Sequence, residues 1–157
     1  MPGLVGRLSG MSALAALATG VYLLRRRTAV VAVVGSSMQP TLAPGDRVLV
    51  RRVRIGQVRT GQIVVIEKPG ESGIWVTPPL TRATGQREWM IKRVAAVPGD
   101  HRPDAMPADS PGLLIPAGKL VVLGDNPARS LDSRQIGYIP AERVLGVVLR
   151  PLYCGAR

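Results

Sequence analysis

Six short runs of β-branched and apolar residues, separated by turns, constrain this chain more than any other feature of its sequence. Each run is too short for a typical helix, and Pro-Gly and Gly-Asp pairs, which favour turns, lie between them. The pattern predicts a mostly β fold, either a partly closed barrel or a coiled sheet. The uninterrupted first run further predicts a strand that is buried on both faces. The six runs are residues 29–34, 48–50, 63–66, 90–97, 120–123 and 144–149.

An apolar stretch precedes these strands. Residues 8–24 include no charged side chain, and as a helix they would be about 25 Å long, at the short end of what spans a bilayer. A cleaved signal peptide and a buried amphipathic helix are the alternatives. Apolar residues continue beyond Ala16-Leu17-Ala18, which resembles a cleavage site, and this continuation favours an anchor. We therefore predict one transmembrane helix at about 8–24 within an anchor and basic flank (1–27), followed by a β domain (28–157).

The charge balance favours an anionic partner. Lys and Arg number 21 against 10 Asp and Glu, a formal net charge of +11, which suits lipid headgroups or nucleic acid. Aromatic residues are only 3% of the chain and Phe is absent, so platforms for base stacking are scarce. We expect the lipid bilayer and no nucleic acid as partner. With a single cysteine, Cys154, and a single histidine, His101, we expect no metal site and no cofactor.

Three segments place polar residues where a strand ends or inside an apolar strand. Gly35-Ser36-Ser37-Met38-Gln39-Pro40-Thr41 follows the first strand directly. Lys92 interrupts the apolar run at 90–97, and residues 124–134 form a polar loop after another strand. Taken singly, these features fit an ordinary turn, a lysine that faces solvent and a common loop.

Together and in this order, the segments resemble the signal peptidase I family of serine endopeptidases, in its minimal form. The family's hallmarks are Ser-Met-x-Pro-Thr, Lys-Arg-Val-x-x-x-Pro-Gly-Asp and Gly-Asp-Asn…Ser-x-Asp-Ser-Arg, and all three are present, as is a Gly-Asp-x-Val-x-Val element at 45–50. The resemblance spans about residues 30–148 and implies a coiled β-sheet domain that carries the active site. It assigns Ser37 as nucleophile, Lys92 as general base, Ser130 as a hydroxyl that orients the lysine, and Asp132 and Arg134 as a supporting ion pair.

The chemistry of these residue types agrees with that assignment. A lysine with its ordinary pKa of about 10.4 is neutral in only about four molecules in ten thousand at pH 7. Burial among apolar neighbours lowers the pKa and lets the amine accept the proton of a serine hydroxyl. The Ser37 backbone N–H is a natural donor to the oxyanion. Some family members carry a serine where this chain has Gly35, so a second donor must come from another group.

The resemblance also implies a substrate, namely the leader peptide of a precursor protein, cleaved after small residues. The residues expected to line the substrate pockets are Val33, Gly35, Met38, Leu42, Met90 and Ile91, although each could equally pack in the core.

The sequence gives two opposing indications of the side of the membrane on which the β domain lies. Arg25, Arg26 and Arg27 follow the predicted helix and favour a cytoplasmic β domain, whereas a secretory signal peptidase works on the outer side, which we expect here. The alternative is a maturation protease that faces the cytoplasm and trims one dedicated precursor, such as nickel superoxide dismutase. A self-cleaving DNA-binding regulator is a further alternative, but residues 1–27 are too short and apolar for a helix-turn-helix.

Overall fold

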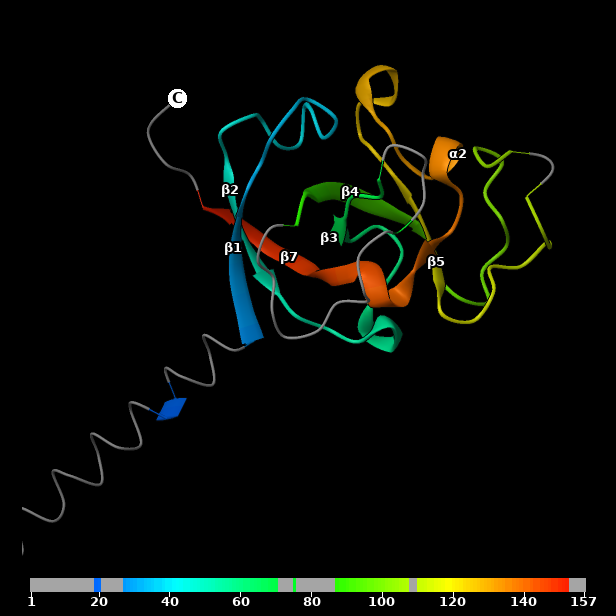
Figure 1. The fold of residues 1–157 in the computed structure, drawn as a ribbon, viewed down its shortest axis with the longest axis horizontal. Coiled ribbons are helices and arrows are strands. Elements are labelled where there is room, and N and C mark those ends of the chain that lie inside the picture. Colours follow the sequence, from blue (N-terminus) through cyan, green and yellow to red (C-terminus); the bar gives the residue numbers. More distant parts are fainter. Residues whose placement is uncertain (1–18, 21–26, 71–74, 76–86, 108–109, 153–157) are drawn as a thin grey trace, which may run out of the picture.

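Seven strands form one antiparallel sheet in the computed structural model, which describes residues 19–20, 27–70, 75, 87–107 and 110–152 (Figure 1). The sheet is curled, and its strand order is β1-β2-β7-β3-β4-β5-β6. The strands are β1 (Thr28–Ala32), β2 (Arg47–Arg51), β3 (Ile63–Glu67), β4 (Trp89–Ala96), β5 (Lys119–Leu123), β6 (Ile139–Pro140) and β7 (Val144–Leu152). The short helices are η1 (Ile55–Gln57), η2 (Pro127–Arg129), α2 (Ser133–Ile136) and η3 (Ala141–Arg143). The prediction of a mostly β fold is confirmed.

The last strand in the sequence occupies the middle of the sheet. β7 pairs with β2 on one side and with β3 on the other, so the first two strands are joined to the rest of the sheet through it. All six predicted runs coincide with strands, and most of the boundaries agree within one or two residues. The two-residue β6 was not predicted; its Pro140 lacks a backbone N–H, which suits a strand at the edge of the sheet.

Apolar side chains cover both faces of the central strands. Alternation along β3 sends Val64 and Ile66 into one cluster with Val94 and Leu120, and sends Val65 into the other. Because β3 lies between β4 and β7 and both of its faces are buried, the strands that neighbour it are held rigidly. This matters for Lys92, which lies on β4.

The first strand corrects one sequence prediction. We expected residues 29–34 to be buried on both faces, but β1 is an edge strand that pairs only with β2. Val31 and Val33 pack inward at 9% and 4% exposure, whereas Val30 and Val34 are 49% and 87% exposed. The outward face of this edge is not covered by any described residue, and an apolar run alone cannot indicate which of its faces finds a partner.

The predicted transmembrane helix at 8–24 lies outside the described residues, apart from Thr19 and Gly20, which are helical. Within the described part of the chain, we find no helix that combines the length and the apolar character needed to span a bilayer.

Candidate active site

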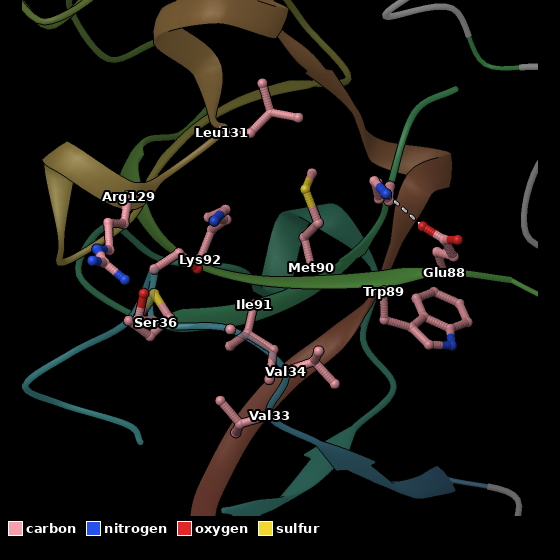
Figure 2. A pocket seen from close by; sticks show the side chains of 14 residues that line it. Val33, Val34, Ser36, Glu88, Trp89, Met90, Ile91, Lys92, Arg129 and Leu131 are labelled. Carbon is pink, nitrogen blue, oxygen red and sulfur yellow. Dashed lines mark hydrogen bonds and ion pairs between the residues drawn. The ribbon is translucent and has the colours of Figure 1, made fainter. Parts of the chain in front are cut away.

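Ser37 and Lys92 both line a groove of about 570 Å³. Figure 2 shows this groove from close by. Its walls come from four places: the segment that leaves β1, the residue that follows β3, the start of β4 with the residue before it, and the loop after β5. The lining residues are Val33, Val34, Gly35, Ser36, Ser37, Met38, Lys68, Glu88, Trp89, Met90, Ile91, Lys92, Arg129 and Leu131. Ser37 and Lys92 are 55 positions apart in the sequence, and only the pairing of the sheet brings them to one groove.

Lys92 is buried in the interior of the sheet. It lies on β4 opposite Val64 of β3 and is only 2% exposed. Figure 2 shows its side chain on the same side of β4 as Met90, while Ile91 points the other way. Among the described residues, no carboxylate forms an ion pair with it. Burial lowers the pKa of Lys92, an effect partly opposed by the charge of Asp132 and assisted by that of Arg134. The site therefore favours a neutral amine.

The Ser37 segment is fixed by hydrogen bonds from Asn126. The Asn126 N–H donates to the Ser37 carbonyl oxygen at 2.9 Å, and its side-chain Nδ2 donates to the Ser36 carbonyl oxygen at 3.2 Å. Gly35 has a φ of 79°, a left-handed conformation that side chains rarely adopt. The chain can therefore turn sharply out of the edge strand just before Ser37, and the backbone of Ser36 and Ser37 is held against the loop after β5.

Ser130, Asp132 and Arg134 form a polar network in which Ser130 and Asp132 are buried and Arg134 is partly exposed. The Ser130 hydroxyl donates to Asp132 Oδ2 at 2.6 Å, and Arg134 binds both carboxylate oxygens, at 2.9 and 2.6 Å. The Gly124 N–H also donates to Asp132, at 2.8 Å. Burial opposes ionisation of Asp132, but these hydrogen bonds outweigh it and lower its pKa to about 2. The ion pair implied by the family resemblance is thus present.

Gly124 lies at the meeting point of these parts. Arg93 pairs with Leu123, the last residue of β5, so Lys92 comes next along β4 and Gly124 is the first residue after β5. A Cβ atom on Gly124 would lie 2.2 Å from Ser130 Oγ and 2.7 Å from the Ser37 carbonyl oxygen. Only glycine leaves room for both serines to approach the end of β5, and this close packing brings the Ser37 segment and the polar network to the same place.

A second polar cluster was missed by sequence reasoning. Arg93 binds both carboxylate oxygens of Asp125, at 2.8 and 2.7 Å, and Thr41 Oγ1 donates to the same carboxylate. The hydrogen bonds from Arg93 lower the pKa of Asp125. One residue of each hallmark motif takes part, so the cluster ties all three motifs together. The sequence offered one signal for this cluster. Arg93 directly follows Lys92, and because neighbouring strand residues point to opposite faces, Arg93 had to lie on the other face of the strand from Lys92.

Five of the six residues expected to line the substrate pockets do line the groove: Val33, Gly35, Met38, Met90 and Ile91. Leu42 does not. It is 2% exposed and packs in the core, because the turn after Ser37, closed by the Leu42 N–H bond to the Met38 carbonyl, directs it inward. Lys68 and Glu88, which form an exposed ion pair of 2.6 Å at the groove, were not foreseen. Their proximity follows only from the pairing of β3 with β4.

Comparisons with known proteins agree with this arrangement. The family model described as signal peptidase, peptidase S26, matches residues 7–102 and 101–153. Signal peptidase I T of Bacillus subtilis is 32% identical over 141 residues, which cover 71% of this chain and 67% of that protein. Signal peptidase I of Bacillus licheniformis is 32% identical over 130 residues, covering 71% and 69%.

A mitochondrial relative matches over a similar share of the chain. The mitochondrial inner membrane protease subunit 1 of Schizosaccharomyces pombe is 32% identical over 110 residues, which cover 68% of this chain and 61% of that protein. The three relatives thus include two bacterial signal peptidases and one organellar protease. On the family match and these identities, the chain belongs to the signal peptidase family, peptidase S26, and is a serine endopeptidase.

Proposed function

We propose that this protein is a membrane-bound endopeptidase that removes signal peptides from precursor proteins after small residues, with Ser37 as nucleophile and Lys92 as general base. One observation carries the proposal. Lys92 shares a groove with Ser37, yet it is buried and has a lowered pKa, and no described carboxylate neutralises it. A buried lysine without an acid partner serves stability poorly and suits proton transfer well.

The neutral amine of Lys92 takes the proton of the Ser37 hydroxyl as Ser37 Oγ attacks the scissile carbonyl carbon. The resulting ammonium then gives that proton to the leaving amine, and an acyl-enzyme ester remains. Lys92 next deprotonates a water molecule, which attacks the ester and frees Ser37. Ser130 is a positioning residue: its proton is committed to Asp132, so its oxygen lone pairs are left to receive the lysine amine.

The apolar wall of the groove supports the preference for small residues. Val33, Met38, Met90 and Ile91 restrict the space beside Ser37, and an extended peptide lying along these residues would place alternate side chains against them. The relatives named as signal peptidases act on leader peptides, and we extend that substrate class to this chain.

The dyad is tested with the full chain in detergent and a synthetic signal-peptide substrate. Ser37→Ala and Lys92→Ala should each lower kcat by at least about a thousandfold, because each removes one member of a unit that transfers a proton together. Lys68→Ala, which removes another lysine of the same groove, and His101→Ala should each change kcat by less than about tenfold. Retained cleavage in a folded Lys92→Ala protein would refute the proposed base.

A separate experiment tests which side of the membrane the active site faces. We favour an extracytoplasmic active site, because the cleavage site of a signal peptide emerges on that side. Arg25, Arg26 and Arg27 favour the opposite orientation, because basic residues that flank a membrane helix tend to lie on the cytoplasmic side. A tag placed after Arg157 should be lost when intact spheroplasts are treated with a protease. A tag that is protected until the membrane is opened would favour instead the protease that faces the cytoplasm and serves one dedicated precursor.

A further inference from the structure

A second pocket lies at the opposite end of β1 from the groove, and arginines dominate its wall. Its volume is about 630 Å³, and its lining residues are Arg27, Arg51, Arg52, Val53, Arg54 and Gln57. The antiparallel pairing of β1 with β2 brings them together: Thr28 pairs with Arg51, and the Arg52 N–H donates to the Arg27 carbonyl oxygen at 2.9 Å. In Figure 1 this is the lower end of β1, next to the end of β2. We call it the arginine pocket.

The position of the arginine pocket is built into the sheet. β7 pairs with the end of β2, and a Cβ atom on Gly146 would lie 2.1 Å from the Arg51 carbonyl oxygen and 3.0 Å from the Arg52 Cα. Glycine at this place allows the backbone of Arg51 and Arg52 to lie in close contact with β7. The backbone of two of the four arginines, Arg51 and Arg52, is therefore held against the central strand of the sheet.

The charge of this pocket is not neutralised within the described part of the chain. The ion pairs found there use Arg87, Arg93, Arg134 and Arg143, and none uses an arginine of the pocket. Four arginines that line one hollow create a positive potential there, and the planar guanidinium fork matches the oxygens of a phosphate group. The pocket is therefore suited to a ligand with a phosphate anion.

The sequence next to the pocket indicates the source of that phosphate. The apolar stretch at 8–24 ends three residues before Arg27, so if that stretch is in a bilayer, the arginine pocket lies at the level of the lipid headgroups. The described residues that line the pocket include no aromatic side chain, which disfavours nucleic acid bases. We propose that the arginine pocket binds the headgroup of an anionic phospholipid and fixes the orientation of the β domain against the membrane.

The test measures lipid binding by native mass spectrometry on the full chain in neutral detergent. A Ser37→Ala background excludes proteolysis, so the result does not depend on whether the proposed dyad is catalytic. Phosphatidylglycerol should bind at least tenfold more tightly than phosphatidylcholine. Arg51→Gln with Arg54→Gln should weaken phosphatidylglycerol binding about thirtyfold, from about 1 kcal/mol for each arginine near an anionic lipid.

A matched control removes the same charge elsewhere. Arg47 and Arg150 are exposed like Arg51 and Arg54, and Arg47 lies at the other end of β2. Arg47→Gln with Arg150→Gln should change the affinity by less than about twofold. Should the pocket variant fail to fold, Arg51→Lys with Arg54→Lys keeps the charge and should still weaken binding severalfold, because lysine lacks the bidentate fork.

Three results would overturn the proposal. One is an equal loss of affinity in the pocket and control variants, which would reduce the effect to overall charge. Another is binding of inorganic phosphate as tightly as phosphatidylglycerol, which would leave the lipid without a role. The third is tighter binding of a single-stranded oligonucleotide than of the lipid, which would assign the pocket to nucleic acid.

Discussion

Two buried charges on neighbouring strands are treated in opposite ways. Glu67, at the end of β3, is 3% exposed and accepts hydrogen bonds from Arg87 at 2.7 Å and Arg143 at 3.0 Å. Arg143 in turn lies over the ring of Trp75, 5.1 Å from its centroid. Lys92, on β4, is 2% exposed and has no such partner among the described residues. The fold thus gives Glu67 two ion-pair partners, whereas no described carboxylate forms an ion pair with Lys92.

The contrast separates a charge that holds the structure from a charge that is available for chemistry. An ion in the interior costs several kcal/mol unless opposite charges and hydrogen bonds surround it. Glu67 meets that condition and joins the end of β3 to η3 and to the segment that enters β4. Burial lowers the pKa of Lys92 and so shifts the side chain toward the unprotonated amine, which is the form that a general base needs.

The largest effect on stability is expected at the compensated charge. Glu67→Ala removes the acid and leaves the guanidinium groups of Arg87 and Arg143 in a buried place, which should lower the free energy of unfolding by about 3–5 kcal/mol. Glu88→Ala is the matched control: Glu88 pairs with Lys68, but its side chain is 74% exposed, so its loss should cost less than about 1 kcal/mol. Chemical denaturation in detergent measures both. Equal costs would remove the distinction between the two ion pairs.

Asp132 extends the comparison to a third buried charge, one that the fold compensates. Its pKa is about 2 in the folded protein against an ordinary 3.8, so it stabilises the fold above pH 4 and loses that contribution as the pH falls through 2. The contribution is about 2 to 3 kcal/mol. Unfolding measured between pH 5 and pH 2 should show this loss in the native protein and a flatter profile in Asp132→Asn. Identical profiles in the two proteins would show that ionised Asp132 does not stabilise the fold.

The smallest effect on the free energy of unfolding, and one of opposite sign, is expected at Lys92. The folded-state pKa of Lys92 lies below its ordinary 10.5, so the folded protein binds fewer protons than the unfolded chain between those two values. Its stability therefore rises with pH in that window, and the full cost applies below it. Lys92→Met should raise the free energy of unfolding at pH 7 by on the order of 1 kcal/mol while abolishing cleavage. Lys68→Met should do neither, and a less stable Lys92→Met protein would argue against the uncompensated charge.

Much of this architecture could be predicted from the sequence, because strand length, turn residues and motif order are local properties. The six apolar runs became strands, and the motifs led to Ser37 and Lys92, which share one groove. Burial depends on neighbours that the sequence does not reveal. The exposed face of β1, the inward turn of Leu42 and the compensation of Glu67 all depend on which strands pair and what covers them.

The place of β7 has a consequence for when the groove can exist during synthesis of the chain. Ser37 lies between β1 and β2, Lys92 lies on β4, and among the described strands β7 is the one that pairs with both halves of the sheet. Residues up to 143 include every motif but lack this strand. Closure of the sheet is thus a late, long-range step in folding. We therefore expect a ribosome-bound chain that has not yet released β7 to be inactive, and cleavage to begin once the sheet is complete.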